Sequence, residues 1–174
     1  MWTPAHIYPS LSRPYAELRT GLGLDPEPQL VLLTRKGDVD VTLPSFEKGA
    51  LIVTTEGPAS RLQRSLPSSS RAVGFPEREL TVRTVVEMLR AEGLKTILTE
   101  GGPTVLGEFL KEGALDELFL TLSPRIAGRM PGDERLNLVE NFAYPPSGLQ
   151  PATLLSAKQD GSHMFLRYRI GRTA

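Results

Sequence analysis

Short apolar runs separated by polar turns recur along most of this chain. Runs of this length without strict alternation are typical of strands buried on both faces of a sheet, and they occupy residues 29–34, 51–55, 72–75, 96–99 and 117–122. Between them the apolar positions take helical spacing, which predicts helices at residues 59–66, 81–92 and 103–112. The pattern therefore predicts strands that alternate with helices.

The last part of the chain has a different rhythm. Residues 152–157 and 164–170 read as strands that flank Gln159-Asp160-Gly161-Ser162. Asp-Gly between two such runs is a strong hairpin signal. Alternating strands and helices followed by a hairpin predict an α/β fold with three layers, built on a mixed sheet with a C-terminal antiparallel hairpin.

The first 28 residues differ from the rest in composition. They are rich in proline and glycine and contain no run that predicts a strand, although a short helix at residues 15–19 is possible. We therefore expect an irregular N-terminal segment at residues 1–28 and a single domain at residues 29–174. So long an irregular start is uncommon in a compact domain unless something else holds it.

The composition of the chain argues against several classes of function and site. The 174 residues have a formal net charge of zero, so no bulk field attracts nucleic acid or a membrane surface. The chain has no cysteine, which excludes disulfides, thiolate catalysis and cysteine zinc sites. The two histidines, His6 and His163, lie far apart without ligand spacing, so no metal site is expected. The N-terminus lacks the regions of a signal peptide, and we expect a cytoplasmic protein.

The stretch Glu100-Gly101-Gly102-Pro103-Thr104 joins the run at 96–99 to the helix predicted from residue 103. Paired glycines let a backbone approach a ligand closely, and the N-terminus of the following helix favours an anion. The alternative is a tight connection without a ligand, and the spacing supports both equally. Glu100 would accept hydrogen bonds from a carboxamide or a sugar hydroxyl, or would cap a neighbouring loop.

Two other predicted strands end in polar side chains. Thr34 and Arg35 follow the first run, and Thr54 and Thr55 close the second. Ligands of open α/β sheets bind at the carboxyl ends of the strands, and an arginine there is a common partner of the 2′-phosphate of NADP. A solvated loop with surface cations is the alternative for Thr34 and Arg35. Together with the glycine turn, these strand ends favour a dinucleotide groove.

No nucleophile or acid–base pair is evident in the sequence, which is compatible with hydride transfer from a bound cofactor. At this point a family resemblance becomes clear. The run from Thr96 through Glu100-Gly101-Gly102-Pro103-Thr104, followed by Asp116-Glu117-Leu118, resembles the reductase domain of bacterial riboflavin biosynthesis. The segments at residues 31–35 and 165–168 are also similar to that family, and the resemblance covers roughly residues 29–170.

The resemblance implies a dihydrofolate-reductase-like fold, NADPH as cofactor, a small heterocyclic substrate and a homodimer. The defining activity of the family is reduction of 5-amino-6-(5-phosphoribosylamino)uracil. By motif, Thr34 and Arg35 would hold the 2′-phosphate end of NADPH, and Thr54 and Thr55 would lie along its adenosine. The pyrophosphate and nicotinamide would be lined by Gly101, Gly102, Pro103 and Thr104, with Glu100 beside them.

The family usually opens with a strand, a helix and a second strand that supply much of the substrate pocket. Residues 1–28 do not resemble that opening, so the chain looks shortened at its N-terminus and its catalytic residues are not identified. Two alternatives follow. One is a non-catalytic nucleotide-binding or assembly remnant of the family, and the other is a reductase of another heterocycle such as a dihydropterin.

Overall fold

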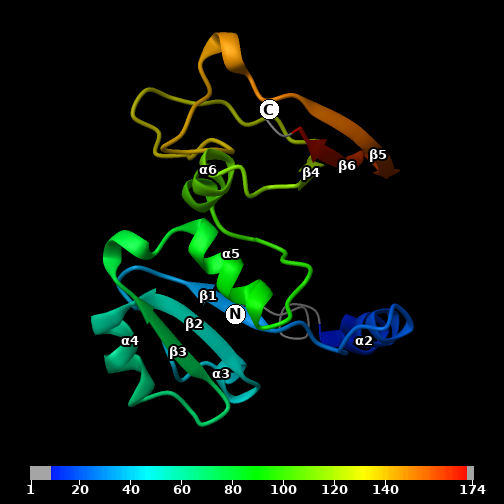
Figure 1. Cartoon of the computed structure of the whole chain (residues 1–174). Helices are drawn as coiled ribbons and strands as arrows, with labels where there is room; N and C mark the ends of the chain where they lie inside the picture. Colours follow the sequence, from blue (N-terminus) through cyan, green and yellow to red (C-terminus); the bar gives the residue numbers. More distant parts are fainter. Residues whose placement is uncertain (1–8, 172–174) are drawn as a thin grey trace. The chain divides into compact units, whose positions relative to one another are not determined.

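The computed structural model describes residues 9–171. The chain forms two compact units, divided between Val85 and Val86, and each is described here by itself. The first unit is built on parallel strands and the second on antiparallel strands (Figure 1). The mixed α/β architecture predicted from the sequence is therefore confirmed, with the two strand directions in separate three-stranded sheets.

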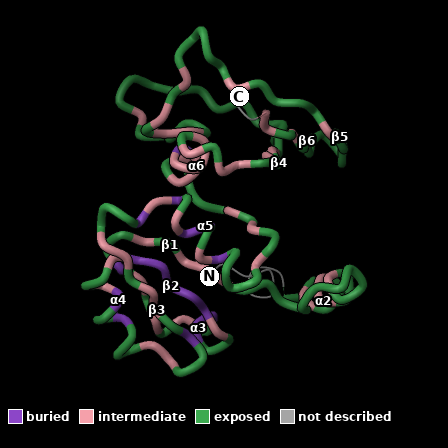
Figure 2. The backbone as a smooth tube through the Cα atoms, in the orientation of Figure 1, coloured by how far each residue is buried: buried purple, intermediate pink, exposed green. Residues whose placement is uncertain are grey.

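The parallel sheet has the order β1-β2-β3, with β1 at Leu30–Leu33, β2 at Ala50–Thr55 and β3 at Arg71–Phe75. All three strands were predicted from their apolar runs. The central strand β2 is buried along almost its whole length (Figure 2). Burial on both faces explains why its sequence is continuously apolar rather than alternating.

The core of this unit gathers around β2. Phe46, Ala50, Ile52 and Leu62 form its buried cluster. Phe46 comes from α3 (Pro44–Glu47), a one-turn helix that the apolar pattern did not predict. The buried Ser70 hydroxyl ties this turn to the sheet, because it donates to the Phe46 carbonyl at 2.6 Å and accepts from the Ala50 amide at 2.8 Å.

Helix α4 (Glu56–Gln63) begins directly after β2 and lies against β2 and β3 (Figure 1). The approach requires a glycine on β3. A Cβ on Gly74 would stand 2.7 Å from the Glu56 Cα and 2.9 Å from the Ala59 Cβ. Gly74 therefore lets the first turn of α4 contact the sheet directly.

Two further α-helices lie where the sequence allowed or predicted a helix, whereas the short helices that precede them were not predicted. Helix α2 (Ser12–Gly21), after the short helix η1 (Pro9–Leu11), contains the residues where a helix was considered possible, and none of its residues is buried. Helix α5 (Val82–Ala91) follows η2 (Glu77–Glu79) and is capped by Thr81, whose hydroxyl accepts from the Thr84 amide at 3.1 Å.

The second unit contains α6 (Pro103–Lys111), the short helix η3 (Pro146–Gly148) and a three-stranded antiparallel sheet. The order is β4-β6-β5, with β4 at Glu117–Leu122, β5 at Ala152–Asp160 and β6 at His163–Ile170. Strands β5 and β6 form the predicted hairpin. Asp160 pairs with His163, so the loop consists of Gly161 and Ser162, and Gly161 takes the left-handed φ of 54° that this turn requires.

The predicted strand at residues 96–99 is not formed. Among the described residues, no strand pairing includes this stretch, and Leu98 is 72% exposed. An apolar run predicts burial, but a strand also needs a neighbouring strand to accept its backbone hydrogen bonds. No helix in the described residues has the length and apolarity that crossing a membrane requires.

The glycine on β3 gives a stability prediction. Gly74→Ala should lower the free energy of unfolding by about 1–3 kcal/mol, because the new methyl group overpacks the contact with α4. Gly57→Ala is the matched control, since a Cβ at Gly57 meets no atom within 4 Å. Urea unfolding of both variants measures the difference. Equal free energies for the two variants would contradict the close contact at Gly74.

Candidate functional site

The turn after β1 is fixed by Thr34. The Thr34 amide donates to the Val53 carbonyl at 3.0 Å and extends the pairing of β1 with β2 by one residue. The Thr34 hydroxyl then accepts from the Gly37 amide at 3.2 Å, and Gly37 takes a left-handed φ of 67°. Residues 34–37 thus form a tight turn, which we call the 34–37 loop.

The two threonines that end β2 reach the same loop. Thr54 and Thr55 both donate through their hydroxyls to the Arg35 carbonyl, at 3.3 Å and 3.0 Å. Thr54 is fully buried. The structure therefore brings together the four residues predicted at the ends of β1 and β2, and the hydroxyls of the three threonines among them hold backbone groups.

One contact to the loop was not predicted from the sequence. Arg61, on α4, donates from Nη2 to the Lys36 carbonyl at 3.0 Å. The loop also lies against the start of α4, because a Cβ on Gly37 would stand 2.8 Å from the Pro58 Cβ. In the sequence, this contact is indicated only by an arginine in the helix that follows β2. Because Lys36 and Arg61 are 25 residues apart, the sequence does not pair them.

The side chains of Arg35 and Lys36 are exposed, and within residues 9–171 neither side chain has a hydrogen-bond or ion-pair partner. The backbone carbonyls of these two residues accept hydrogen bonds, whereas their charged side chains have no partner among residues 9–171. A cation that forms no internal ion pair keeps its charge available for an anionic ligand, and a guanidinium matches phosphate with two parallel donors.

The segment that follows this loop carries one perturbed carboxyl group. The Thr42 hydroxyl donates to Asp40 Oδ1 at 2.6 Å, and the Thr42 amide donates to the same atom at 3.0 Å. The hydroxyl bond first, and the amide bond second, lower the pKa of Asp40 below its ordinary value. Asp40 is therefore a carboxylate that closes its own turn, rather than a proton donor near neutral pH.

In the second unit, the two glycines of the turn before α6 have different reasons to be glycine. A Cβ on Gly101 would stand 2.7 Å from both the Cβ and the Cγ1 of Val105. A Cβ on Gly102 would meet no atom within 4 Å. Packing within the chain thus explains Gly101, whereas Gly102 leaves open space at the helix N-terminus.

Gly102 is the N-cap residue of α6 and Pro103 is its first residue, and no side chain in the described part of the chain caps the helix. The Thr99 hydroxyl accepts from the Gly101 amide at 3.3 Å. Glu100 and Thr104 are exposed, and no partner of the Glu100 carboxylate is found in the described part of the chain. The uncapped N–H groups suit an anion.

Helix α6 is held from its other side by residues 140–142. The Glu140 amide donates to the Pro103 carbonyl at 3.1 Å. At Gly107 a Cβ would stand only 2.3 Å from the Glu140 carbonyl oxygen. The first turn of α6 is therefore fixed by backbone contacts.

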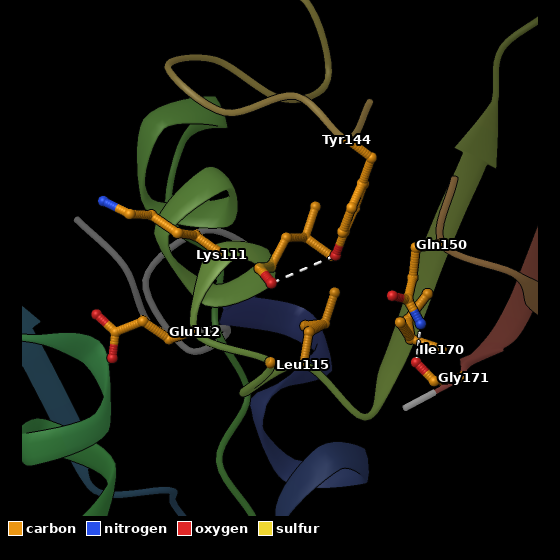
Figure 3. A pocket seen from close by; sticks show the side chains of 9 residues that line it. Lys111, Glu112, Leu115, Tyr144, Gln150, Ile170 and Gly171 are labelled. Atoms are coloured by element: carbon orange, nitrogen blue, oxygen red, sulfur yellow. Dashed lines mark hydrogen bonds between the residues drawn. The ribbon is translucent and has the colours of Figure 1, made fainter. Parts of the chain in front are cut away.

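A pocket of about 340 Å³ lies within the second unit, beyond the C-terminal end of α6. Its lining includes Leu115, Tyr144, Gln150 and Ile170 (Figure 3), and none of the residues predicted as a cofactor site. The Tyr144 hydroxyl donates to the Leu110 carbonyl at 3.3 Å, and the Gln150 amide donates to the Gly171 carbonyl. These two hydrogen bonds pair polar groups of the pocket lining with one another.

The residues present fit a phosphate-bearing cofactor within each unit. The first unit offers an exposed guanidinium, unpaired among residues 9–171, on a loop with fixed carbonyls. The second offers an uncapped helix N-terminus with open space at Gly102. In the described residues, no group of histidine, aspartate and glutamate side chains could hold a metal ion.

The glycine turn gives a second stability prediction. Gly101→Ala should lower the free energy of unfolding by about 1–3 kcal/mol, because the new Cβ would displace the stiff Val105 side chain. Gly128→Ala in the same unit is the control, since its Cβ would meet no atom within 4 Å. Thermal or urea unfolding reports the difference. A Gly101→Ala variant as stable as the control would show that Val105 does not determine the glycine.

Comparison with known proteins gives a consistent family. The family model described as the RibD C-terminal domain matches residues 4–144. The Riboflavin biosynthesis protein RibD of Mycobacterium tuberculosis is 35% identical over 69 residues, which are 38% of this chain and 20% of that protein. This chain thus spans a fifth of the length of that relative.

Two solved structures share the fold. A pyrimidine reductase-like protein from Corynebacterium diphtheriae matches with a TM-score of 0.68 and 23% identity, over 91% of this chain and 67% of that one. A diaminohydroxyphosphoribosylaminopyrimidine deaminase/5-amino-6-(5-phosphoribosylamino)uracil reductase from Thermotoga maritima matches with a TM-score of 0.64 and 20% identity, over 83% of this chain and 38% of that one. The dihydrofolate-reductase-like fold is confirmed.

The family match also corrects the extent of the resemblance. The sequence suggested a likeness from about residue 29, whereas the family model begins to match at residue 4. The proline-rich start is therefore part of the matched region. The family model matches well over half of the length of this chain. The chain therefore belongs to the RibD C-terminal domain family.

Proposed function

We propose that this chain is an NADPH-dependent reductase that acts on 5-amino-6-(5-phosphoribosylamino)uracil or a close relative of it. Membership of the RibD C-terminal domain family supports the reaction class. The single structural observation that carries the cofactor assignment is the 34–37 loop, where threonine hydroxyls hold the backbone and the Arg35 side chain stays exposed and unpaired within the described residues.

In this proposal Arg35 binds the 2′-phosphate of NADPH. Thr34, Thr54 and Thr55 hold the loop from which Arg35 extends, so they act on the cofactor through the backbone of the loop. A loop fixed before binding loses less conformational entropy when the phosphate arrives. This role differs from the direct contact with adenosine that the resemblance implied for Thr54 and Thr55.

The turn before α6 is the second element of the proposal. Gly102, with the N-terminus of α6, would bind a pyrophosphate group, while Gly101, Pro103 and Thr104 shape the turn. Glu100 is exposed beside it and would accept hydrogen bonds from the carboxamide. NADPH supplies a hydride when it is bound, and the chain supplies binding and orientation.

The proposal covers the reductase reaction alone. The Thermotoga maritima protein is named as a deaminase and a reductase, and this chain covers 38% of it. Reduction of the phosphoribosylamino group consumes one hydride and one proton and opens the ribose ring. The substrate is thus a pyrimidine that carries a sugar phosphate. We also propose that the reaction takes place in the cytoplasm, because a chain without cysteine fits a reducing compartment.

The cofactor assignment gives a binding prediction. Arg35→Ala should weaken NADPH about tenfold or more and leave NADH nearly unchanged, because only NADPH carries the 2′-phosphate that a charge-assisted bond would hold. Titration of the full chain, followed by the fluorescence of the reduced nicotinamide, measures both affinities. Arg64→Ala is the control, an exposed arginine at the other end of α4.

Three outcomes separate the possibilities. Equal losses for both nucleotides in Arg35→Ala would remove the 2′-phosphate assignment. If the wild-type chain binds neither nucleotide, the proposal that NADPH is the cofactor is wrong. Binding of NADPH without its oxidation by the phosphoribosylamino pyrimidine would favour the nucleotide-binding remnant, whereas oxidation only with a dihydropterin would favour the other reductase.

We further propose a homodimer. Strands β4 and β5 are the outer strands of the antiparallel sheet, and eight of the nine residues of β5 are exposed. Exposed outer strands favour pairing with another chain. Sedimentation at micromolar concentration should show a species of twice the chain mass, and a monomer throughout that range would count against the dimer.

A further inference from the structure

Beyond the bond from the Thr34 amide to the Val53 carbonyl, the 34–37 loop is attached to the rest of its unit through two of its own carbonyl groups. The Arg35 carbonyl accepts two hydrogen bonds, from Thr54 and Thr55. The Lys36 carbonyl accepts one side-chain hydrogen bond, from Arg61 Nη2 at 3.0 Å. Arg61 is therefore the side chain that holds the Lys36 carbonyl, while the Thr34 hydroxyl accepts from the Gly37 amide within the loop.

The helix that carries Arg61 is itself firmly placed. Ala59 and Leu62, on either side of Arg61 in α4, are 7% and 5% exposed. Gly74 lets the start of the helix touch the sheet, and Gly37 lies close enough to Pro58 that a Cβ there would stand 2.8 Å away. The guanidinium of Arg61 thus reaches the loop from a helix that packing holds in place.

Arg61 contacts the backbone of a loop that itself carries two cationic residues. Arg61 uses Nη2 on the Lys36 carbonyl and is otherwise exposed, while the side chains of Arg35 and Lys36 extend from the same loop and are exposed. Holding the carbonyls against β2 and α4 leaves the cationic side chains as the groups that a ligand meets. The bond from Arg61 therefore influences where the charge of Arg35 is presented.

We propose that Arg61 is a positioning residue for cofactor selectivity: it holds the Lys36 carbonyl, fixes the 34–37 loop and so determines how strongly Arg35 distinguishes a 2′-phosphate from a 2′-hydroxyl. This inference rests on the proposed function and deepens it. The recognised chemical group is a phosphate monoester on a ribose, and Arg61 acts on it through the loop.

The test compares the affinities of the full chain for NADPH and NADH in four proteins. They are the wild type, Arg61→Met, Arg61→Lys and the matched control Arg64→Met, which removes an exposed arginine of the same unit. Arg61→Met keeps the aliphatic stem but removes the donor, and Arg61→Lys keeps a donor and the charge. Deuterium uptake of residues 34–37 is measured on the same samples.

We expect Arg61→Met to lower the ratio of the NADH to the NADPH dissociation constant about fivefold, the effect of losing one hydrogen bond. Its 34–37 loop should also exchange deuterium faster, because a tether is gone. Arg61→Lys should keep the ratio within about twofold of the wild type, since it retains a charged donor. Arg64→Met should leave both the ratio and the exchange unchanged.

The contrary results are distinct. If the wild type shows no preference for NADPH, the proposed function fails and the role of Arg61 fails with it. If the wild type prefers NADPH and Arg61→Met keeps that preference, the role of Arg61 alone is overturned. An equal loss for both nucleotides in Arg61→Met also overturns it, because a selectivity residue must change the ratio.

Discussion

The close approach of helix α4 to the parallel sheet is the contact on which the rest of the first unit depends. Gly74 permits it, since a side chain there would collide with the backbone of Glu56. The helix can then start directly at the end of β2 and bring Pro58 and Arg61 beside the 34–37 loop. A contact between backbone and backbone places the site more rigidly than long side chains would.

In the 34–37 loop, hydrogen bonds hold the backbone, and the charged side chain of Arg35 stays exposed. Threonine hydroxyls and one guanidinium satisfy the carbonyls of Arg35 and Lys36, so the loop has a fixed shape before any ligand arrives. The Arg35 side chain takes no part in these bonds among the described residues and stays exposed. This arrangement gives recognition of a phosphate a physical basis, because the conformational entropy of the loop has already been lost on folding.

The glycine pair before α6 shows how one motif can combine two causes. Gly101 is required by the side chain of Val105, whereas Gly102 has open space around its Cα. The sequence was compatible both with a purely structural turn and with a ligand-binding turn. The contacts in the structure explain only one of the two glycines. Packing within the chain accounts for Gly101, and the ligand remains the proposed reason for Gly102. Membership of the RibD C-terminal domain family makes a reductase the natural context for that proposal.

The sequence by itself determined the strands β1 to β6, the helices α4 to α6 and the C-terminal hairpin, because apolar periodicity, caps and turn residues act over a few neighbouring positions. It also placed Arg35 and the glycine turn at the ends of predicted elements. Only the tertiary structure decided that Thr54 and Thr55 share the Arg35 carbonyl, that Arg61 reaches Lys36, and that residues 96–99 form no strand. These outcomes depend on which backbone groups meet across the fold, and that is set by strand register and helix packing rather than by local pattern.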